Sequence, residues 1–171
     1  MDKRWIYILI IFIIGVSCLY LVADTSTTIG KANVKVNAFL ITIPDSYNID
    51  DTGGAYAQLI NRNTNEIINV EDMGKGNTIK DFSDIEIDML EMNESFSKVE
   101  KGTFKIDNES YTCISYETDS DDNTTNQIIY FTKYNHTFRI ESTNIQNNNT
   151  LKDNIKFIMD SLTPNYKQKQ D

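Results

Sequence analysis

The spacing of apolar residues changes twice along this chain, from the alternation of strands to the period of a helix, and this pattern constrains the fold most. In the first half, alternation predicts three strands, separated by a turn at residues 50–54 and an Asn-rich loop at residues 61–65. The predicted strands are residues 34–43, 56–61 and 66–72. The first changes phase between Val36 and Phe39, so we expect a bulge near Asn37 and Ala38.

The next segment has the period of a helix. Phe82, Ile85, Met89 and Phe96 recur at helical spacing, which predicts an amphipathic helix over residues 79–96 with these side chains facing the core. Acidic side chains fall largely on its other faces, and those in the first turn favour the start of the helix.

The second half repeats the order of strands followed by a helix. Four further strands are predicted at residues 98–106, 109–118, 125–134 and 136–143, with tight turns between them at Asp107-Asn108 and at Asn135. A second helix is indicated by apolar residues at i, i+4, i+7 and i+11, which are Leu151, Ile155, Ile158 and Leu162. Asn149 or Thr150 can cap this helix and Pro164 ends it.

The order of three strands, a helix, four strands and a helix predicts an α+β fold. We expect an antiparallel meandering sheet of six or seven strands, with both helices packed on its apolar surface. The expected organisation is an N-terminal transmembrane anchor at residues 1–23, a flexible linker at 24–33, one α+β domain at 34–164 and a polar tail at 165–171.

The N-terminal anchor is predicted from an uninterrupted apolar run. Residues 6–22 would extend about 26 Å as a helix, close to the ~30 Å of a hydrocarbon core. Lys3 and Arg4 precede the run, whereas the residues that follow it carry no positive charge. The positive-inside rule therefore predicts a single-pass protein of the cell membrane, with its N-terminus cytoplasmic and its domain outside.

Two other interpretations of this run remain open. A cleaved secretory signal also has a charged start and an apolar core. However, the apolar core of a signal is shorter than the run at residues 6–22, and Leu21 stands where the cleavage site needs a small residue. A lipoprotein would use Cys18 as its lipidated residue, yet more apolar residues follow Cys18 instead of a soluble domain.

Charge and cysteine content restrict the partners of the domain. Residues 1–23 hold two of the 16 Lys and Arg residues and one of the 25 Asp and Glu residues, so the remainder carries a net charge of −10. An acidic domain is unsuited to nucleic acid or anionic lipid. Cys18 and Cys113 cannot form an intrachain disulfide while the anchor is inserted, so the domain folds without one.

Asparagine residues offer possible modification sites on an exported domain. The motif Asn-x-Ser/Thr occurs five times, and such motifs are acceptors for N-linked glycans. The candidate residues are Asn93, Asn108, Asn123, Asn135 and Asn148. Their number alone decides nothing, since a chain rich in Asn, Ser and Thr produces several by chance.

The beginning and end of the domain carry a family resemblance. The opening strand reads Phe39-Leu40-Ile41-Thr42-Ile43-Pro44-Asp45-Ser46-Tyr47, and the final helix ends in Phe157-Ile158-Met159-Asp160-Ser161-Leu162. Both resemble domains of the extrinsic photosystem protein PsbP and its prokaryotic relatives, including the DcrB lipoproteins, over residues 35–163. Tyr47 stands where Trp is usual, and Ser46 where Gly is usual. The resemblance implies a fold and an exported, membrane-associated setting, and it offers no shared catalytic residue.

The residue types needed for common catalytic and metal sites are scarce. His136 is the single histidine and lies at a predicted hairpin turn, where we interpret it as exposed, without a nucleophile nearby. One histidine and one domain cysteine exclude a zinc site of the usual spacing. Asp119, Asp121 and Asn123 have the spacing of three calcium ligands, but Thr124 and Tyr130 replace the Gly and Glu that an EF-hand loop requires.

The sequence therefore predicts no catalytic residue and no cofactor. The leading hypothesis is a non-enzymatic binding or assembly-assisting module of the cell envelope, held on the membrane beside an envelope or membrane protein partner. The alternatives are a small-ligand or calcium-binding surface module and, third, a secreted enzyme. A concave apolar pocket with converging polar groups would favour the ligand-binding alternative.

Overall fold

The fold is taken from a computed structural model of the chain, in which residues 32–76, 78–119 and 124–165 are described. The chain divides into two compact units, Met1–Ala32 and Asn33–Asp171, and every element below belongs to the second. The predicted anchor and most of the linker lie outside the described residues. Within the described ranges, neither helix combines the length and hydropathy needed to cross a membrane.

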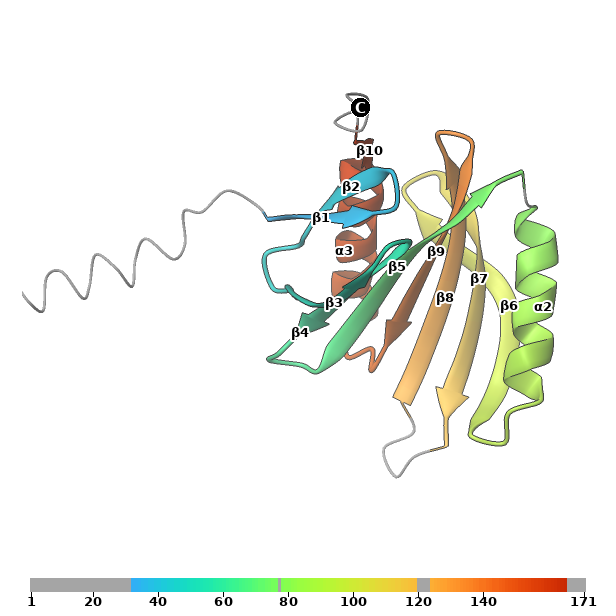
Figure 1. The fold of residues 1–171 in the computed structure, drawn as a ribbon. Coiled ribbons are helices and arrows are strands. Elements are labelled where there is room, and N and C mark those ends of the chain that lie inside the picture. Colours follow the sequence, from blue (N-terminus) through green and yellow to red (C-terminus); the bar gives the residue numbers. More distant parts are fainter. Residues whose placement is uncertain (1–31, 77, 120–123, 166–171) are drawn as a thin grey trace, which may run out of the picture. The chain divides into compact units, whose positions relative to one another are not determined.

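Ten strands and two helices make up the described part of the chain (Figure 1). Before the first helix come β1 (Asn33–Val36), β2 (Phe39–Thr42), β3 (Asn48–Gly53), β4 (Tyr56–Asn61) and β5 (Glu66–Lys75). They are followed by α2 (Ile79–Glu91), β6 (Phe96–Ile106), β7 (Glu109–Thr118), β8 (Thr124–Lys133), β9 (His136–Thr143), α3 (Asn148–Ser161) and β10 (Thr163–Pro164).

The strands form a seven-stranded antiparallel sheet and a small second sheet. The large sheet has the order β3-β4-β5-β9-β8-β7-β6, so two meanders meet where β5 pairs with β9 and Val70 lies opposite Ile140. The small sheet has the order β1-β2-β10. The α+β class with two helices and antiparallel strands is therefore confirmed, but the sheet is not one continuous meander.

Two predictions about the first strands are wrong. Residues 34–43 are not one bulged strand but the hairpin β1–β2, in which Asn37 takes a φ of 52° at the turn. The phase change in the sequence marks a chain reversal, because Asn tolerates the left-handed region that such a turn requires. The predicted turn at residues 50–54 instead lies mostly within β3, whose pairing with β4 shifts register between Ile49 and Asp51.

The two helices cover opposite faces of the large sheet, contrary to the prediction of a shared surface. On β8, Ile129 and Phe131 belong to the main core beneath α3, whereas Ile128 and Tyr130 belong to a second core beneath α2. Because successive residues of a strand point to opposite faces, this uninterrupted apolar run marks a strand buried on both sides. Figure 1 shows α2 beside β6 and β7, with α3 beside the β1–β2 hairpin.

The first helix ends five residues earlier than predicted. Thr78 caps its start by accepting a hydrogen bond from the Asp81 N–H at 3.2 Å, and its last residue is Glu91. Asn93 then forms a turn, with its side chain accepting the Ser95 N–H at 3.0 Å. Phe96 opens β6 and packs edge-on against Tyr116 at 5.0 Å, so its apolar contact belongs to the sheet and not to the helix.

Candidate functional site

The outer face of α2 exposes a row of large apolar side chains. Ile85 is 58% exposed, Met89 64%, and Met92, which caps the C-terminal end of the helix, 84%. These three residues, which we call the α2 stripe, are spaced i, i+4 and i+7 and therefore lie along one side of the helix. Single exposed apolar residues are ordinary, but a contiguous row is typical of an interaction surface.

The α2 stripe contradicts the predicted orientation of this helix. The sequence pattern places Ile85 and Met89 in the core, yet Leu90 is the large side chain buried there, with Phe82 and Ile87 packed against the same cluster. The helix has apolar residues on two sides, and periodicity alone does not reveal which side meets the sheet.

A row of acidic side chains runs beside the α2 stripe. It consists of Asp81, Asp84, Asp88 and Glu91, which we call the acidic row, and all four residues are exposed. Asp84 accepts a hydrogen bond from Lys101 of β6 at 2.6 Å, and this contact lowers the pKa of the Asp84 carboxyl. The described surface of α2 is therefore apolar along the stripe and negative beside it.

A buried arginine on β9 fixes α2 to the sheet from beneath. The Arg139 side chain is 13% exposed, and its Nη2 donates to Glu86 of α2 at 2.9 Å. Its Nη1 donates to Glu141, two residues along the same strand, at 3.2 Å. Although burial lowers the pKa of Arg139, the charges of Glu141 and Glu86 outweigh it and raise that pKa.

Two tyrosines extend this ion-pair cluster across the sheet. Tyr130 donates to Glu86 at 3.2 Å, and Tyr116 donates to Glu141 at 2.7 Å. Burial raises the pKa of both hydroxyls, and the adjacent carboxylates raise it further. Both hydroxyls therefore stay protonated near neutral pH, and they act as fixed donors that hold the carboxylates in place.

Arg139, Glu86 and Glu141 were not predicted from the sequence, although two signals point to them. Arg139 and Glu141 alternate with the fully buried Phe138 and Ile140, so one face of a central strand carries charges of both signs. Glu86 stands between Phe82 and Leu90 at spacings of four residues, which places a charge within the buried row of α2.

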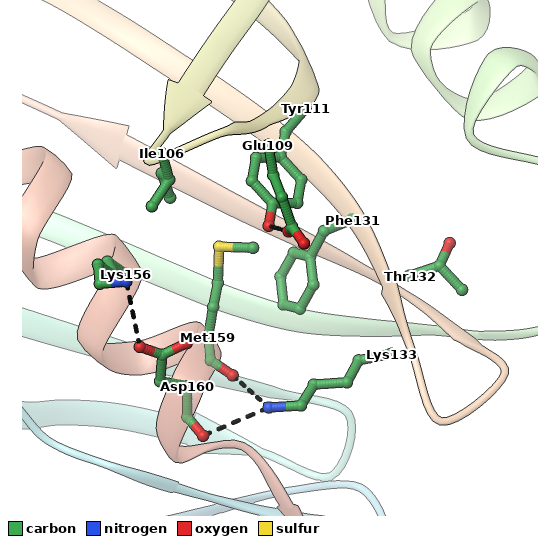
Figure 2. A pocket seen from close by; sticks show the side chains of 9 residues that line it. All are labelled: Ile106, Glu109, Tyr111, Phe131, Thr132, Lys133, Lys156, Met159 and Asp160. Carbon is green, nitrogen blue, oxygen red and sulfur yellow. Dashed lines mark hydrogen bonds and ion pairs between the residues drawn. The ribbon is translucent and has the colours of Figure 1, made fainter.

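A pocket of about 240 Å³ opens on the other face of the sheet, between α3 and the β6–β7 turn (Figure 2). Its apolar lining comes from Ile106, Phe131 and Met159. Tyr111 also lines it and donates to Glu109, which raises the pKa of Tyr111 to about 12. This concave site is the feature that would favour a small ligand.

The charged groups of this pocket are engaged with one another. Lys133 Nζ donates to the carbonyl oxygens of Met159 and Asp160, at 2.6 and 3.3 Å, and so neutralises the C-terminal end of α3 (Figure 2). Lys156 pairs with Asp107 and lies 3.7 Å from Asp160. A ligand would have to displace these partners, so the pocket is less suited to binding than the α2 stripe.

The predicted calcium and glycan sites lie only partly within the described residues. Asp119 accepts a hydrogen bond from Ser97 at 2.5 Å, while Asp121 and Asn123 lie outside the described residues. In the described ranges, no three His, Cys, Asp or Glu side chains gather as metal ligands would. The glycan candidates Asn93, Asn108, Asn135 and Asn148 are exposed, and Asn123 is again outside the described residues.

His136 and Cys113 differ in their surroundings from catalytic groups. His136 is not the exposed turn residue predicted, because its side chain is 12% exposed and its Nδ1 lies 2.9 Å from the buried Asp72. Asp72 also accepts from Asn37 at 2.7 Å, so this pair ties β5 and β9 to the β1–β2 hairpin. Burial raises the pKa of the Cys113 thiol to about 11, which makes it a poor nucleophile.

Comparison with known proteins supports the fold alone. No family model and no curated protein matches the chain. Cyanobacterial PsbP (CyanoP) from Synechocystis sp. PCC 6803 is similar in structure, with a TM-score of 0.53, 11% identity and coverage of 81% of this chain and 95% of that chain.

A protein from Bacteroides thetaiotaomicron has a TM-score of 0.50 and 15% identity. That match covers 83% of this chain and 51% of the other, so the chain spans about half of the Bacteroides protein. The sequence resemblance and the structural match to CyanoP agree, and the described domain has a PsbP-like fold.

Proposed function

We propose that this chain is a membrane-anchored accessory domain that binds a protein partner outside the cytoplasm through the α2 stripe, without catalysing a reaction. The observation that carries the proposal is the exposure of Ile85, Met89 and Met92 in one row on a helix whose other side is already packed on the sheet. Methionine side chains adapt to irregular partner surfaces, which suits a docking role.

The size of the α2 stripe explains why an anchor would matter. Full burial of an Ile or Met side chain contributes about 1.5–3 kcal/mol, and these residues are already partly buried. The stripe thus offers only a few kcal/mol, while association itself costs about 4–15 kcal/mol. Tethering raises the effective concentration of the domain near membrane neighbours and makes such a weak contact productive.

The extracytoplasmic setting is supported by the sequence. The apolar run at residues 6–22 is long enough for one span, and Lys3 with Arg4 favours a cytoplasmic N-terminus. The acidic domain, with its net charge of −10, has little affinity for the negative head groups beside it. The domain would therefore stand away from the lipid surface, with α2 accessible to a protein.

The test uses the full chain in intact cells and a cross-linker that does not cross membranes. We expect one or a few specific adducts, and Met89→Asp should reduce their yield about tenfold, because a charge would enter an apolar contact. Ile49→Asp is the matched control, since Ile49 is a similarly exposed apolar residue, 43%, at the opposite edge of the sheet. Adducts that Met89→Asp leaves unchanged would contradict docking through α2. An absence of adducts would contradict the binding of a protein partner outside the cytoplasm.

A second candidate function is small-ligand binding at the pocket beside α3. The favouring observation is its apolar lining of Phe131 and Met159 beneath polar groups that converge from α3 and the β6–β7 turn. A small molecule that co-purifies with the native chain and is lost in Met159→Trp would place this function first.

A further inference from the structure

We infer that the partner segment seated on the α2 stripe is a basic amphipathic helix, with apolar side chains at i, i+4 and i+7 and Lys or Arg along its flank. The inference rests on the proposed function and adds the chemistry of the partner. Two observations carry it: the helical spacing of the exposed apolar residues and the negative charge on both sides of them.

One flank of the stripe is the acidic row. At about 100° per residue, Ile85, Met89 and Met92 fall within roughly 60° of each other around the helix. Asp81 and Asp88 lie next to them on one side, and Asp84 and Glu91 lie further round the helix on that same side. Lys101 pairs with Asp84, but among the described residues the side chains of Asp81, Asp88 and Glu91 make no ion pair. Three carboxylates are thus available to a cationic partner.

The opposite flank is also negative. On this side of the helix, Phe82 is followed by Glu86, which faces the sheet. There Arg139 is surrounded by Glu86, Glu141 and Glu71, and the distance from Arg139 Nη1 to the Glu71 carboxylate is 4.0 Å. One cation is therefore surrounded by three carboxylates, of which Glu71, at 40%, is the most exposed and Glu86 and Glu141 are largely buried. A partner resting on the stripe meets negative charge on both sides, and the potential favours Lys and Arg at its edges.

This charge pattern disfavours the other possible occupants. A second copy of the chain, docked stripe to stripe, would bring two acidic rows together, which is unfavourable. Anionic lipid head groups would be repelled in the same way. A helical segment fits because side-chain rows at i and i+4 on two helices interlock, and the stripe runs for about 10 Å, or two turns.

The experiment measures contact at α2 directly. The full chain, carrying the photoreactive residue benzoylphenylalanine in place of Met89, is placed in phosphatidylcholine nanodiscs. It is irradiated with either of two synthetic helical peptides that share Leu at i, i+4 and i+7. One peptide has Lys at its flanking positions and the other has Glu there. Benzoylphenylalanine in place of Asn63, an exposed loop residue, controls for random contact.

We expect the Lys peptide to cross-link at position 89 roughly tenfold more than the Glu peptide, and D88K/E91K to reverse this preference. Equal yields from both peptides would overturn the basic partner while leaving the proposed function intact. Adducts that join two copies of the chain, or that form with lipid instead of peptide, would also overturn it. The proposed function fails separately, if the adducts seen in intact cells do not respond to Met89→Asp.

Discussion

Arg139 determines how firmly α2 is held against the sheet. Replacing it with Leu would leave Glu86 and Glu141 largely buried, at 21% and 18% exposure, without their cation. Breaking a buried pair in this way costs about 3–5 kcal/mol. We therefore expect Arg139→Leu to lower the unfolding temperature of the full chain strongly, as measured by circular dichroism in detergent.

Lys98→Ala is the control for this residue. Lys98 pairs with Glu117 at 2.7 Å, but its side chain is 67% exposed, and such surface pairs contribute about 0–1 kcal/mol. If both variants lost the same stability, the Arg139 cluster would contribute no more to the free energy of unfolding than a surface ion pair does. If Glu86→Gln restored part of the stability lost in Arg139→Leu, the cost would be traced to the uncompensated carboxylate.

The partners and burial of individual residues were the hardest features to predict from the sequence. The sequence places Arg139 in a strand, but its carboxylate partners come from α2 and from its own strand, 53 and 2 residues away. Ion pairs over such separations depend on tertiary packing, which alternation and periodicity do not encode. His136 was wrongly predicted to be exposed for the same reason, since its partner Asp72 lies 64 residues earlier.

At the scale of the element, neighbouring residues of α2 should respond oppositely to truncation. Leu90 is 6% exposed, and Leu90→Ala should destabilise the chain by about 2–5 kcal/mol through lost burial and a cavity. Met89 is 64% exposed, so Met89→Ala should change stability by no more than about 0.5 kcal/mol. Chemical unfolding of the two variants, compared with the parent chain, measures both.

The opposite order of effects would mean that α2 presents the face that the sequence pattern suggests. Helix α3 shows why the pattern succeeded elsewhere. Its residues Leu151, Ile155 and Ile158, with Leu162 directly after its end, form one row, and all four are fully buried. Helix α2 has two apolar rows, and only the packing of β7 and β8 selects between them. The helix was predicted to be too long because Phe96 fits the helical period yet begins a strand.

At the scale of the whole molecule, the class and the order of most elements followed from the sequence, while the sheet arrangement did not. Alternation identifies strands and short loops identify hairpins, so both meanders could be predicted. The junction of β5 with β9 pairs Glu71 with Arg139 across 68 positions, and no local signal encodes it. The small sheet depends likewise on β10, where Thr163 pairs with Leu40.

The same whole-molecule packing predicts sensitivity to alkaline pH. Burial raises the pKa of Tyr47, Tyr116 and Tyr130, and that of Cys113 to about 11. In the unfolded chain these groups titrate near their ordinary values, about 8.5 for Cys and 10 for Tyr. Above those values the unfolded state releases protons that the folded state retains, so stability falls as pH rises.

We therefore expect an unfolding temperature that is constant from about pH 7 to 8.5 and falls progressively towards about pH 12. Circular dichroism gives the unfolding temperature, and tyrosinate absorbance shows whether ionisation accompanies unfolding. Tyr47→Phe removes one titrating hydroxyl and should move the alkaline transition to higher pH. The absorbance of the parent chain is compared with that of Tyr47→Phe, because exposed tyrosines contribute equally to both. A difference between the two that appeared well before the fold was lost would contradict the prediction, because Tyr47 would then ionise in the native protein.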